Sequence, residues 1–228
     1  MTSSKQNELI GFIPLAGKGM RMRPITTTLP KALIEIHCKS LLERAIDALK
    51  TIGIKKIIVV AGYMEEKVSG FIDTKDFNIQ IELVSQKEQL GLSHAIFTSI
   101  EHLTSDFVLL CPDSLCTNLD DFYRARNAFN EYSPAALQTV TLAPTTQEGR
   151  LIYHSNNFIN IAPNLFSNGL KNTDSTNFAM YSTGLVFISK NSLSYLTSLS
   201  DFKSDIGFSS FLSTLKDKMP FMLYLMRG

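Results

Sequence analysis

The sequence is poor in tryptophan, cysteine and net charge. It has no tryptophan, and its three cysteines, Cys38, Cys111 and Cys116, cannot all pair and show no repeated ligand spacing. A disulfide framework and a zinc site are therefore both disfavoured. The 22 basic and 21 acidic residues leave a formal charge of only +1, which excludes a general electrostatic attraction to nucleic acid or to an anionic membrane. Any positive charge that matters must be local.

Long hydrophobic runs are also missing. Residues 1–17 lack the apolar stretch of a signal peptide, and no later run approaches the roughly 20 residues of a membrane span. We therefore expect a cytoplasmic protein without membrane or nucleic-acid partners. Its 228 residues, of which 44% are hydrophobic, are enough to bury a substantial core.

Short apolar runs alternate with segments of helical periodicity. The runs predict buried strands at residues 10–15, 56–60, 79–84, 107–111, 136–142 and 180–188. The alternation predicts an α/β fold, with a doubly wound, mainly parallel, Rossmann-like sheet that has helices on both faces. In such sheets ligands bind beyond the carboxyl ends of the strands.

The clearest helix signal begins at Ser40. Ser40 and Glu43 can form a capping box, an apolar face follows, and Gly53 supplies the stop. Further helices are expected after Gly91 and at residues 191–199 and 205–215.

Four basic side chains surround a two-glycine turn after the first predicted strand: Lys18, Arg21, Arg23 and Lys31. Gly17 and Gly19 let backbone N–H groups approach an anion closely. Arg21 can contact two phosphate oxygens, and Lys31 can supply a point charge on a second phosphate. The turn lacks the third glycine of a dinucleotide fingerprint and the GKS or GKT of a P-loop. The residues favour a polyphosphate site of another type, and the alternative is a solvated loop with incidental charges.

The order of residues in this loop resembles that of a known family. Gly17-x-Gly19-x-Arg21-x-x-Pro24-x-Thr26, followed by Pro30-Lys31-x-Leu33, is similar to the signature loop of the sugar-1-phosphate nucleotidylyltransferase superfamily, in particular its short bacterial members. The stretches GYMEEKV, LGLSHAI, LLCPDS and MYSTGLVFIS follow in the order that the family shows. The resemblance therefore covers nearly the whole chain.

The resemblance implies transfer of a nucleotidyl group. An acceptor, a sugar 1-phosphate or a similar small phosphomonoester, attacks the α-phosphorus of a nucleoside triphosphate, and pyrophosphate leaves. The protein must position two polyanions and neutralise their charge. Arg21, on the β- and γ-phosphates, and Lys31, near the α-phosphate, are the implied catalytic residues. Asp113 is implied to bind the cofactor Mg²⁺, an ion that suits carboxylates and substrate phosphates.

The implied nucleotide-binding residues are Leu15, Ala16, Gly17, Gly19, Gln86, Gly91 and Leu92. Gln86 is expected to pair with the base edge, with the backbone of Gly91 on the other side. A carboxamide offers a donor and an acceptor, which suits the imide edge of uracil or thymine, although it could flip to meet cytosine. A pyrimidine is therefore preferred, and a strand-end glutamine without a role is the alternative. His94 is expected to be packed or to cap a helix.

The chain departs from the family pattern in three places. Met20 stands where a small hydroxyl residue is usual, and Ala162 stands where a second lysine would contact the sugar phosphate. The C-terminal WxDxGT stretch, which supplies a second Mg²⁺ carboxylate in the family, is expected to be missing, because the chain has no tryptophan and its last residues are YLMRG. We expect one domain over residues 1–228, with about 144–178 as an acceptor-side lobe.

Two other functions stay open. A catalytically impaired relative would bind a nucleotide or a nucleotide sugar as a sensor or partner subunit. A doubly wound dehydrogenase or methyltransferase is disfavoured, because no three-glycine pattern follows the first strand. A homo-oligomer is compatible with any of these functions.

Overall fold

The computed structural model describes residues 8–114, 118–144, 151–153, 178–197 and 205–226. In this part of the chain the main sheet has eight strands, in the order β10-β7-β9-β6-β1-β4-β5, with β8 paired to β9. The strands are β1 (Ile10–Pro14), β4 (Lys56–Ala61), β5 (Gln80–Ser85), β6 (Phe107–Leu110), β7 (Ala136–Pro144), β8 (Leu151–Tyr153), β9 (Phe178–Ile188) and β10 (Phe221–Leu225).

The core of this sheet is parallel. β1 lies between β4 and β6 and is parallel to both, and β4 is parallel to β5. β9 runs antiparallel between β6 and β7, while the edge strand β10 is parallel to β7. The predicted mainly parallel sheet is therefore confirmed, with an antiparallel insertion that the sequence pattern did not predict.

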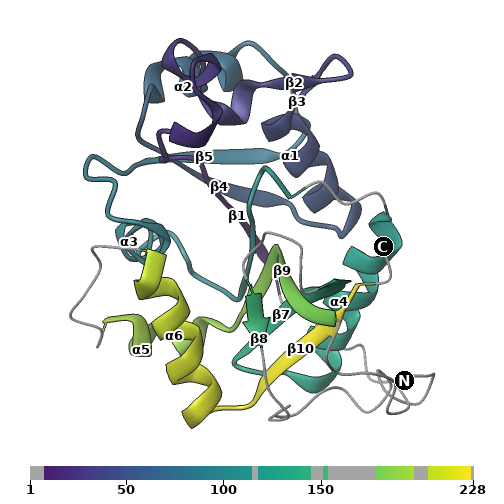
Figure 1. Cartoon of the computed structure of the whole chain (residues 1–228). Helices are drawn as coiled ribbons and strands as arrows, with labels where there is room; N and C mark the ends of the chain where they lie inside the picture. Colours follow the sequence, from purple (N-terminus) through teal and green to yellow (C-terminus); the bar gives the residue numbers. More distant parts are fainter. Residues whose placement is uncertain (1–7, 115–117, 145–150, 154–177, 198–204, 227–228) are drawn as a thin grey trace.

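Helices cover both faces of the sheet (Figure 1), as the sequence predicts. One face packs against α1, α2 and α4, and the other packs against α3, α5 and α6. Successive strand residues alternate between the faces: Ile13 and Val59 belong to the first buried cluster, and Phe12 and Val60 to the second. The helices are α1 (Leu41–Thr51), α2 (Glu65–Asp73), α3 (Leu92–Thr98), α4 (Leu119–Tyr132), α5 (Leu193–Thr197) and α6 (Asp205–Lys218).

The first helix begins as its sequence predicts. The Ser40 hydroxyl accepts a hydrogen bond from the Glu43 backbone N–H (3.1 Å), and the Glu43 carboxylate accepts one from the Ser40 N–H (2.8 Å). Burial raises the pKa of Glu43, but hydrogen bonds from Lys75 and Ser40 outweigh it and lower the pKa below its ordinary value. Gly53 follows the helix with a φ of 77°, in the left-handed region that favours glycine.

Several elements were not predicted from the sequence. α2, α4 and β10 are regular elements, and β2 (Glu35–Ile36) and β3 (Lys39–Ser40) form a short hairpin. The expected turn at 148–150 and most of the expected lobe at 144–178 lie outside the described residues, as does Cys116. None of the helices in the described ranges is both long and apolar enough to cross a membrane.

Candidate active site

The carboxyl ends of β1, β4, β5 and β6 meet at one edge of the sheet, because these strands are parallel neighbours. Leu15 and Ala16 directly follow β1 and are both buried. The Leu15 N–H donates to the Val60 carbonyl (2.7 Å), and the Ala16 carbonyl accepts from the Tyr63 N–H (3.2 Å). The backbone of the predicted nucleotide loop therefore leaves the sheet in a fixed direction, at the edge where such folds bind ligands.

The loop between β1 and β2 folds back on itself through three short 3₁₀ turns, η1 (Met20–Met22), η2 (Ile25–Thr27) and η3 (Lys31–Leu33). The Thr26 hydroxyl donates to the Gly19 carbonyl (2.8 Å). Gly19 has a φ of 59°, and a methyl group placed on it would lie 3.0 Å from Thr26 Cγ2 and 3.3 Å from Lys31 Cβ. Gly19 therefore lies against Lys31, although the two are twelve positions apart in the sequence.

Two residues of the β4–α2 segment anchor this loop. The Tyr63 hydroxyl donates to the Thr26 carbonyl (3.2 Å), and the Lys67 ammonium donates to the Thr28 carbonyl. The sequence pattern predicts no role for either side chain. Their stretch, GYMEEKV, belongs to the family pattern, but no feature of its composition indicates which loop it contacts.

Lys31 and Asp113 form an ion pair across the site. The Lys31 ammonium contacts Oδ2 of Asp113, which lies in the segment that follows β6. Both side chains reach solvent, with exposed fractions of 33% for Lys31 and 48% for Asp113. The structure therefore brings together one implied catalytic residue and the implied metal ligand, which are 82 positions apart.

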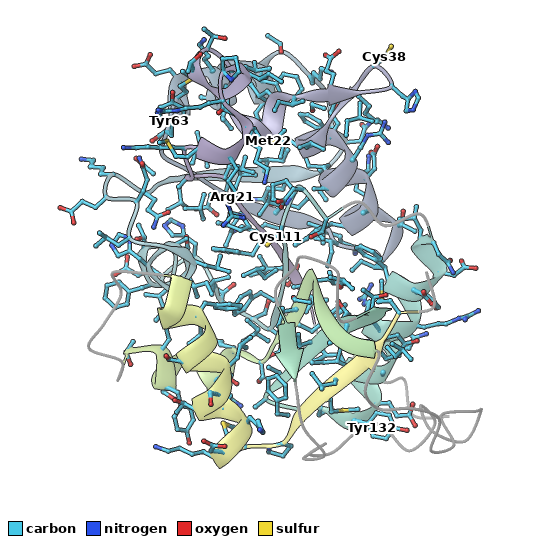
Figure 2. All side chains as sticks on the ribbon, viewed as in Figure 1. Arg21, Met22, Cys38, Tyr63, Cys111 and Tyr132 are labelled. Atoms are coloured by element: carbon cyan, nitrogen blue, oxygen red, sulfur yellow. The ribbon has the colours of Figure 1, made fainter. Side chains whose placement is uncertain are left out.

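Arg21 is exposed two residues beyond Gly19. Figure 2 shows it in the middle of the view, between Met22 and Cys111, the residue directly after β6. Within the described part of the chain its guanidinium has no hydrogen-bond or ion-pair partner. It is therefore free to bind an anion that enters from solvent.

A bulge in β9 braces the segment that carries Asp113. The pairing of β7 with β9 shifts register between Gln138 and Val140, and at this point Gly184 has a φ of 78°. The Gly184 carbonyl accepts from the Cys111 N–H (2.9 Å). A methyl group on Gly184 would lie 2.0 Å from Ser114 Oγ, so a side chain there would collide with the Asp113 segment. No sequence signal indicated this contact beyond the glycine within MYSTGLVFIS.

Gln86 lies just beyond β5 and is only 2% exposed. Its Nε2 donates to the Gly91 carbonyl (3.1 Å) and lies 2.8 Å from His94 Nδ1. Gly91 precedes α3, and Leu92 is the first residue of that helix and is half-buried. The structure therefore brings Gln86, Gly91 and Leu92 together.

Gly17 and Lys18 are exposed, and a methyl group on Gly17 would meet nothing within 4 Å. The space beside this glycine is therefore open. A separate groove of about 830 Å³ opens beside Gly62, but Glu65, Glu66 and Asp73 line it. Carboxylates repel phosphates, so this groove is not where a triphosphate would bind.

Asp113 has the chemistry of a Mg²⁺ ligand. Its carboxylate reaches solvent and already attracts the cation of Lys31. Mg²⁺ is commonly bound through one or two carboxylates together with substrate phosphates and water. No group of three or more His, Cys, Asp or Glu side chains suited to a metal occurs among the described residues. A magnesium ion at Asp113 would therefore take much of its coordination from a bound phosphate compound.

Comparison with known proteins gives relatives that match about half of the chain. The chain is 37% identical over 107 residues to the UTP–glucose-1-phosphate uridylyltransferase AglF of Haloferax volcanii, covering 46% of this chain and 44% of that protein. It is 35% identical over 118 residues to the bifunctional protein GlmU of Methanococcus maripaludis, covering 51% of this chain and 28% of that protein. It is 29% identical over 115 residues to the 2-aminoethylphosphonate cytidylyltransferase of Lancefieldella rimae, covering 50% and 46%. The chain thus spans less than half the length of each of these relatives.

Solved structures with the same fold cover almost the whole chain. A Bacillus anthracis protein described as a glucose-1-phosphate thymidylyltransferase has a TM-score of 0.78 at 16% identity, covering 96% of this chain and 87% of that one. A UDP-glucose pyrophosphorylase complexed with UDP-glucose has a TM-score of 0.70 at 16% identity, covering 96% and 91%. At this identity the likeness concerns the fold.

A family model described as "Nucleotidyl transferase" matches residues 11–153, which are more than half of the chain. The match includes the signature loop, Gln86, Gly91 and Asp113. The chain therefore belongs to the nucleotidyl transferase family.

Proposed function

We propose that the chain is a Mg²⁺-dependent nucleotidyltransferase of the cytoplasm. It transfers a nucleoside monophosphate from a pyrimidine nucleoside triphosphate to a sugar 1-phosphate or a similar small phosphomonoester. The observation that carries the proposal is the contact between Lys31 and Asp113, which joins the signature loop after β1 to the carboxylate after β6. The family match and the open space at Gly17 also support it.

The reaction is an in-line displacement at the α-phosphorus. A phosphate oxygen of the acceptor forms a bond to this phosphorus, the bond to the β-phosphate oxygen breaks, and pyrophosphate leaves with the electron pair. The protein needs no covalent intermediate, so its main tasks are to position two anions and to stabilise the charge on their oxygens.

The basic residues of the loop suit these tasks. Arg21, which is exposed and lacks a partner in the described part of the chain, would hold the β- and γ-phosphates through two N–H donors. When the nucleotide binds, the Lys31 side chain would move so that its ammonium leaves Asp113 and contacts the α-phosphate. The backbone N–H groups near Gly17 and Gly19 would contact the phosphates, because glycine leaves them accessible.

Asp113 would hold the magnesium ion, together with phosphate oxygens. When bound, this ion would screen the negative charge of the attacking and leaving groups. In the absence of substrate the Lys31 ammonium neutralises the Asp113 carboxylate. This ion pair also keeps the carboxylate oriented toward the loop. Leu15 and Ala16 would support the nucleotide with their backbone, and Gln86, Gly91 and Leu92 would contact the base.

The proposed acceptor is small and anionic. Relatives of the chain are named for glucose 1-phosphate and for 2-aminoethylphosphonate, both of which carry one phosphoryl or phosphonyl group. A sugar 1-phosphate is preferred because the first of these relatives has the higher identity, 37% against 29%.

One observation favours a second function. Asp113 is a single carboxylate, and the described residues contain no larger group of metal ligands around it. A chain with an incomplete metal site would bind a nucleotide or nucleotide sugar without turnover, and would act as a sensor or as a partner subunit.

Pyrophosphate release separates the two functions. The purified chain is incubated with UTP, dTTP or CTP, with glucose 1-phosphate or 2-aminoethylphosphonate, and with or without Mg²⁺. Release that requires nucleotide, acceptor and Mg²⁺ supports the enzyme. Nucleotide binding without release supports the sensor, and the absence of nucleotide binding contradicts both.

A further inference from the structure

The carboxamide of Gln86 is held in one orientation by two neighbours. Its Nε2 lies 3.1 Å from the carbonyl oxygen of Gly91 and 2.8 Å from Nδ1 of His94. A carbonyl oxygen accepts hydrogen bonds and cannot donate one, so the group that faces Gly91 must be the NH₂ of the amide. The orientation of the amide therefore follows from its partner.

The same contact fixes the tautomer of His94. Since the amide NH₂ is a donor, Nδ1 of His94 must be the acceptor, and the imidazole proton of the neutral ring lies on Nε2. Both N–H bonds of the Gln86 amide are then used, one by Gly91 and one by His94. The Gly91 carbonyl is also fully used, because it accepts from the Ala95 N–H (3.1 Å) as well.

The other end of the amide is available. Within the described part of the chain, Oε1 of Gln86 accepts no hydrogen bond, and it is not among the enclosed atoms that lack a partner. The Gln86 backbone is fixed as well, since its N–H donates to the Ala61 carbonyl (2.7 Å) and a methyl group on Gly62 would lie 2.7 Å from its carbonyl oxygen. Gln86 therefore offers a ligand one acceptor and no donor.

We propose that His94 is a positioning residue that holds Oε1 of Gln86 toward the nucleobase, so that the site prefers uracil or thymine to cytosine. This inference rests on the proposed function and names its nucleotide. Uracil and thymine carry an N–H at ring position 3, which can donate to Oε1, whereas cytosine has an unprotonated nitrogen there. With cytosine bound in the same position, its N3 and Oε1 of Gln86 would face each other as two acceptors. To avoid this, the base would have to move away from the position that the bound triphosphate gives it.

A flip of the amide does not rescue cytosine binding. It would turn Oε1 toward the Gly91 carbonyl, which is an acceptor in every case, so this hydrogen bond of a buried side chain would be lost. The contact with His94 would persist only if the imidazole proton moved from Nε2 to Nδ1. The Gly91 carbonyl and the Nε2–H tautomer of His94 therefore both disfavour the flipped amide.

Two variants test the role of His94 through a ratio of affinities. The wild-type chain is titrated calorimetrically with UTP and with CTP in the presence of Mg²⁺, and UTP is expected to bind about tenfold more tightly. His94→Leu keeps the bulk but removes the acceptor, so the ratio should fall roughly fivefold. His94→Asn supplies an oxygen that accepts the same hydrogen bond, so the ratio should recover. Equal losses of UTP and CTP affinity in His94→Leu would indicate a merely structural residue and would overturn the inference.

The tautomer is measured independently by ¹⁵N NMR of the imidazole ring. The expected spectrum has an unprotonated Nδ1 and a protonated Nε2, and a proton on Nδ1 would overturn the inference whatever the affinities are. If wild-type chain binds UTP and CTP equally, the inference is wrong but the proposed function stands. If it binds no nucleotide, both are wrong.

Discussion

The ammonium group of Lys31 lies on the carboxylate of Asp113, so that a residue of the loop after β1 meets a residue of the segment after β6. The chain contains a second exposed pair of the same kind, between Lys39 of β3 and Asp47 of α1. Exposed pairs contribute only about 0–1 kcal/mol to stability. Both pairs should therefore contribute little to the free energy of unfolding. Only the Lys31–Asp113 pair should affect turnover.

Removing the carboxylate should abolish turnover. Asp113→Asn is expected to lower kcat by about 100-fold or more, because the magnesium ion loses its only proposed protein ligand. The measurement is pyrophosphate release as a function of Mg²⁺ concentration. Asp47→Asn is the matched control, since Asp47 is also exposed and paired with a lysine. Full activity of Asp113→Asn would show that Asp113 does not hold the metal.

Removing the ammonium should act on the chemical step rather than on the fold. Lys31→Ala is expected to lower kcat about 100-fold and to change the free energy of unfolding by less than about 1 kcal/mol. Stopped assays and urea unfolding of the same sample give the two quantities. Lys39→Ala should change neither. A loss of stability in Lys31→Ala that matches its loss of activity would contradict a role in catalysis.

A methyl group at Gly17 should separate nucleotide binding from stability. Gly17→Ala meets no atom within 4 Å in the free chain, so its unfolding should be almost unchanged, while its methyl group should block the approach of phosphates to the backbone. We expect UTP affinity to fall about tenfold or more. Gly70→Ala, in α2, also meets no atom and should raise stability by about 0.5–1 kcal/mol with unchanged UTP affinity. Unchanged UTP affinity in Gly17→Ala would exclude the close approach.

The bulge at Gly184 should position the Asp113 segment. Gly184→Ala combines a positive φ with a contact of 2.0 Å to Ser114 Oγ, and should destabilise the chain by about 1–3 kcal/mol and raise the Mg²⁺ concentration needed for activity. Ser114→Gly added to it removes the collision but not the backbone strain. The double variant should therefore recover Mg²⁺ affinity better than stability. Additive effects of the two substitutions would exclude direct contact.

Acid should weaken the cluster around Glu82. The hydrogen bond from Lys56 (2.7 Å) and that with His102 lower the pKa of Glu82 below its ordinary value of 4.5, against the opposing effect of burial. The stabilisation is therefore complete above pH 4.5 and is lost as the pH falls below it. Glu82→Gln should lower the free energy of unfolding near neutral pH, and the difference from wild type should shrink below pH 4.5. Glu101→Gln, at an exposed residue, is the control, and a pH-independent difference for Glu82→Gln would contradict this account.

Much of the fold could be predicted from local signals. The strands near 10–15, 56–60 and 107–111 are continuous apolar runs because both faces of the sheet are covered, and the Ser40–Glu43 cap is encoded within four residues. The antiparallel insertion of β9 could not be predicted, because its pairing with β6 and β7 depends on residues far apart in the sequence.

In the candidate site, too, some features are encoded by local sequence and others depend on distant residues. The loop glycines and basic residues are a local pattern, and the sequence indicated them. The anchors Tyr63 and Lys67 and the brace at Gly184 act through contacts with other segments, which no spacing encodes. The orientation of the Gln86 amide depends on the hydrogen-bond acceptors beside it, the Gly91 carbonyl and His94 Nδ1. The sequence alone does not show these contacts, so it left both orientations open.

A crystal structure of the chain with UTP and Mg²⁺ would show whether the loop after β1 and Asp113 form one nucleotide site. We predict that the triphosphate lies along the loop from Gly17 to Lys31, with Arg21 on the β- and γ-phosphates and the metal on Asp113. Lys31 should have left Asp113 for the α-phosphate. A triphosphate bound elsewhere, with Lys31 still on Asp113 and Arg21 in solvent, would contradict it.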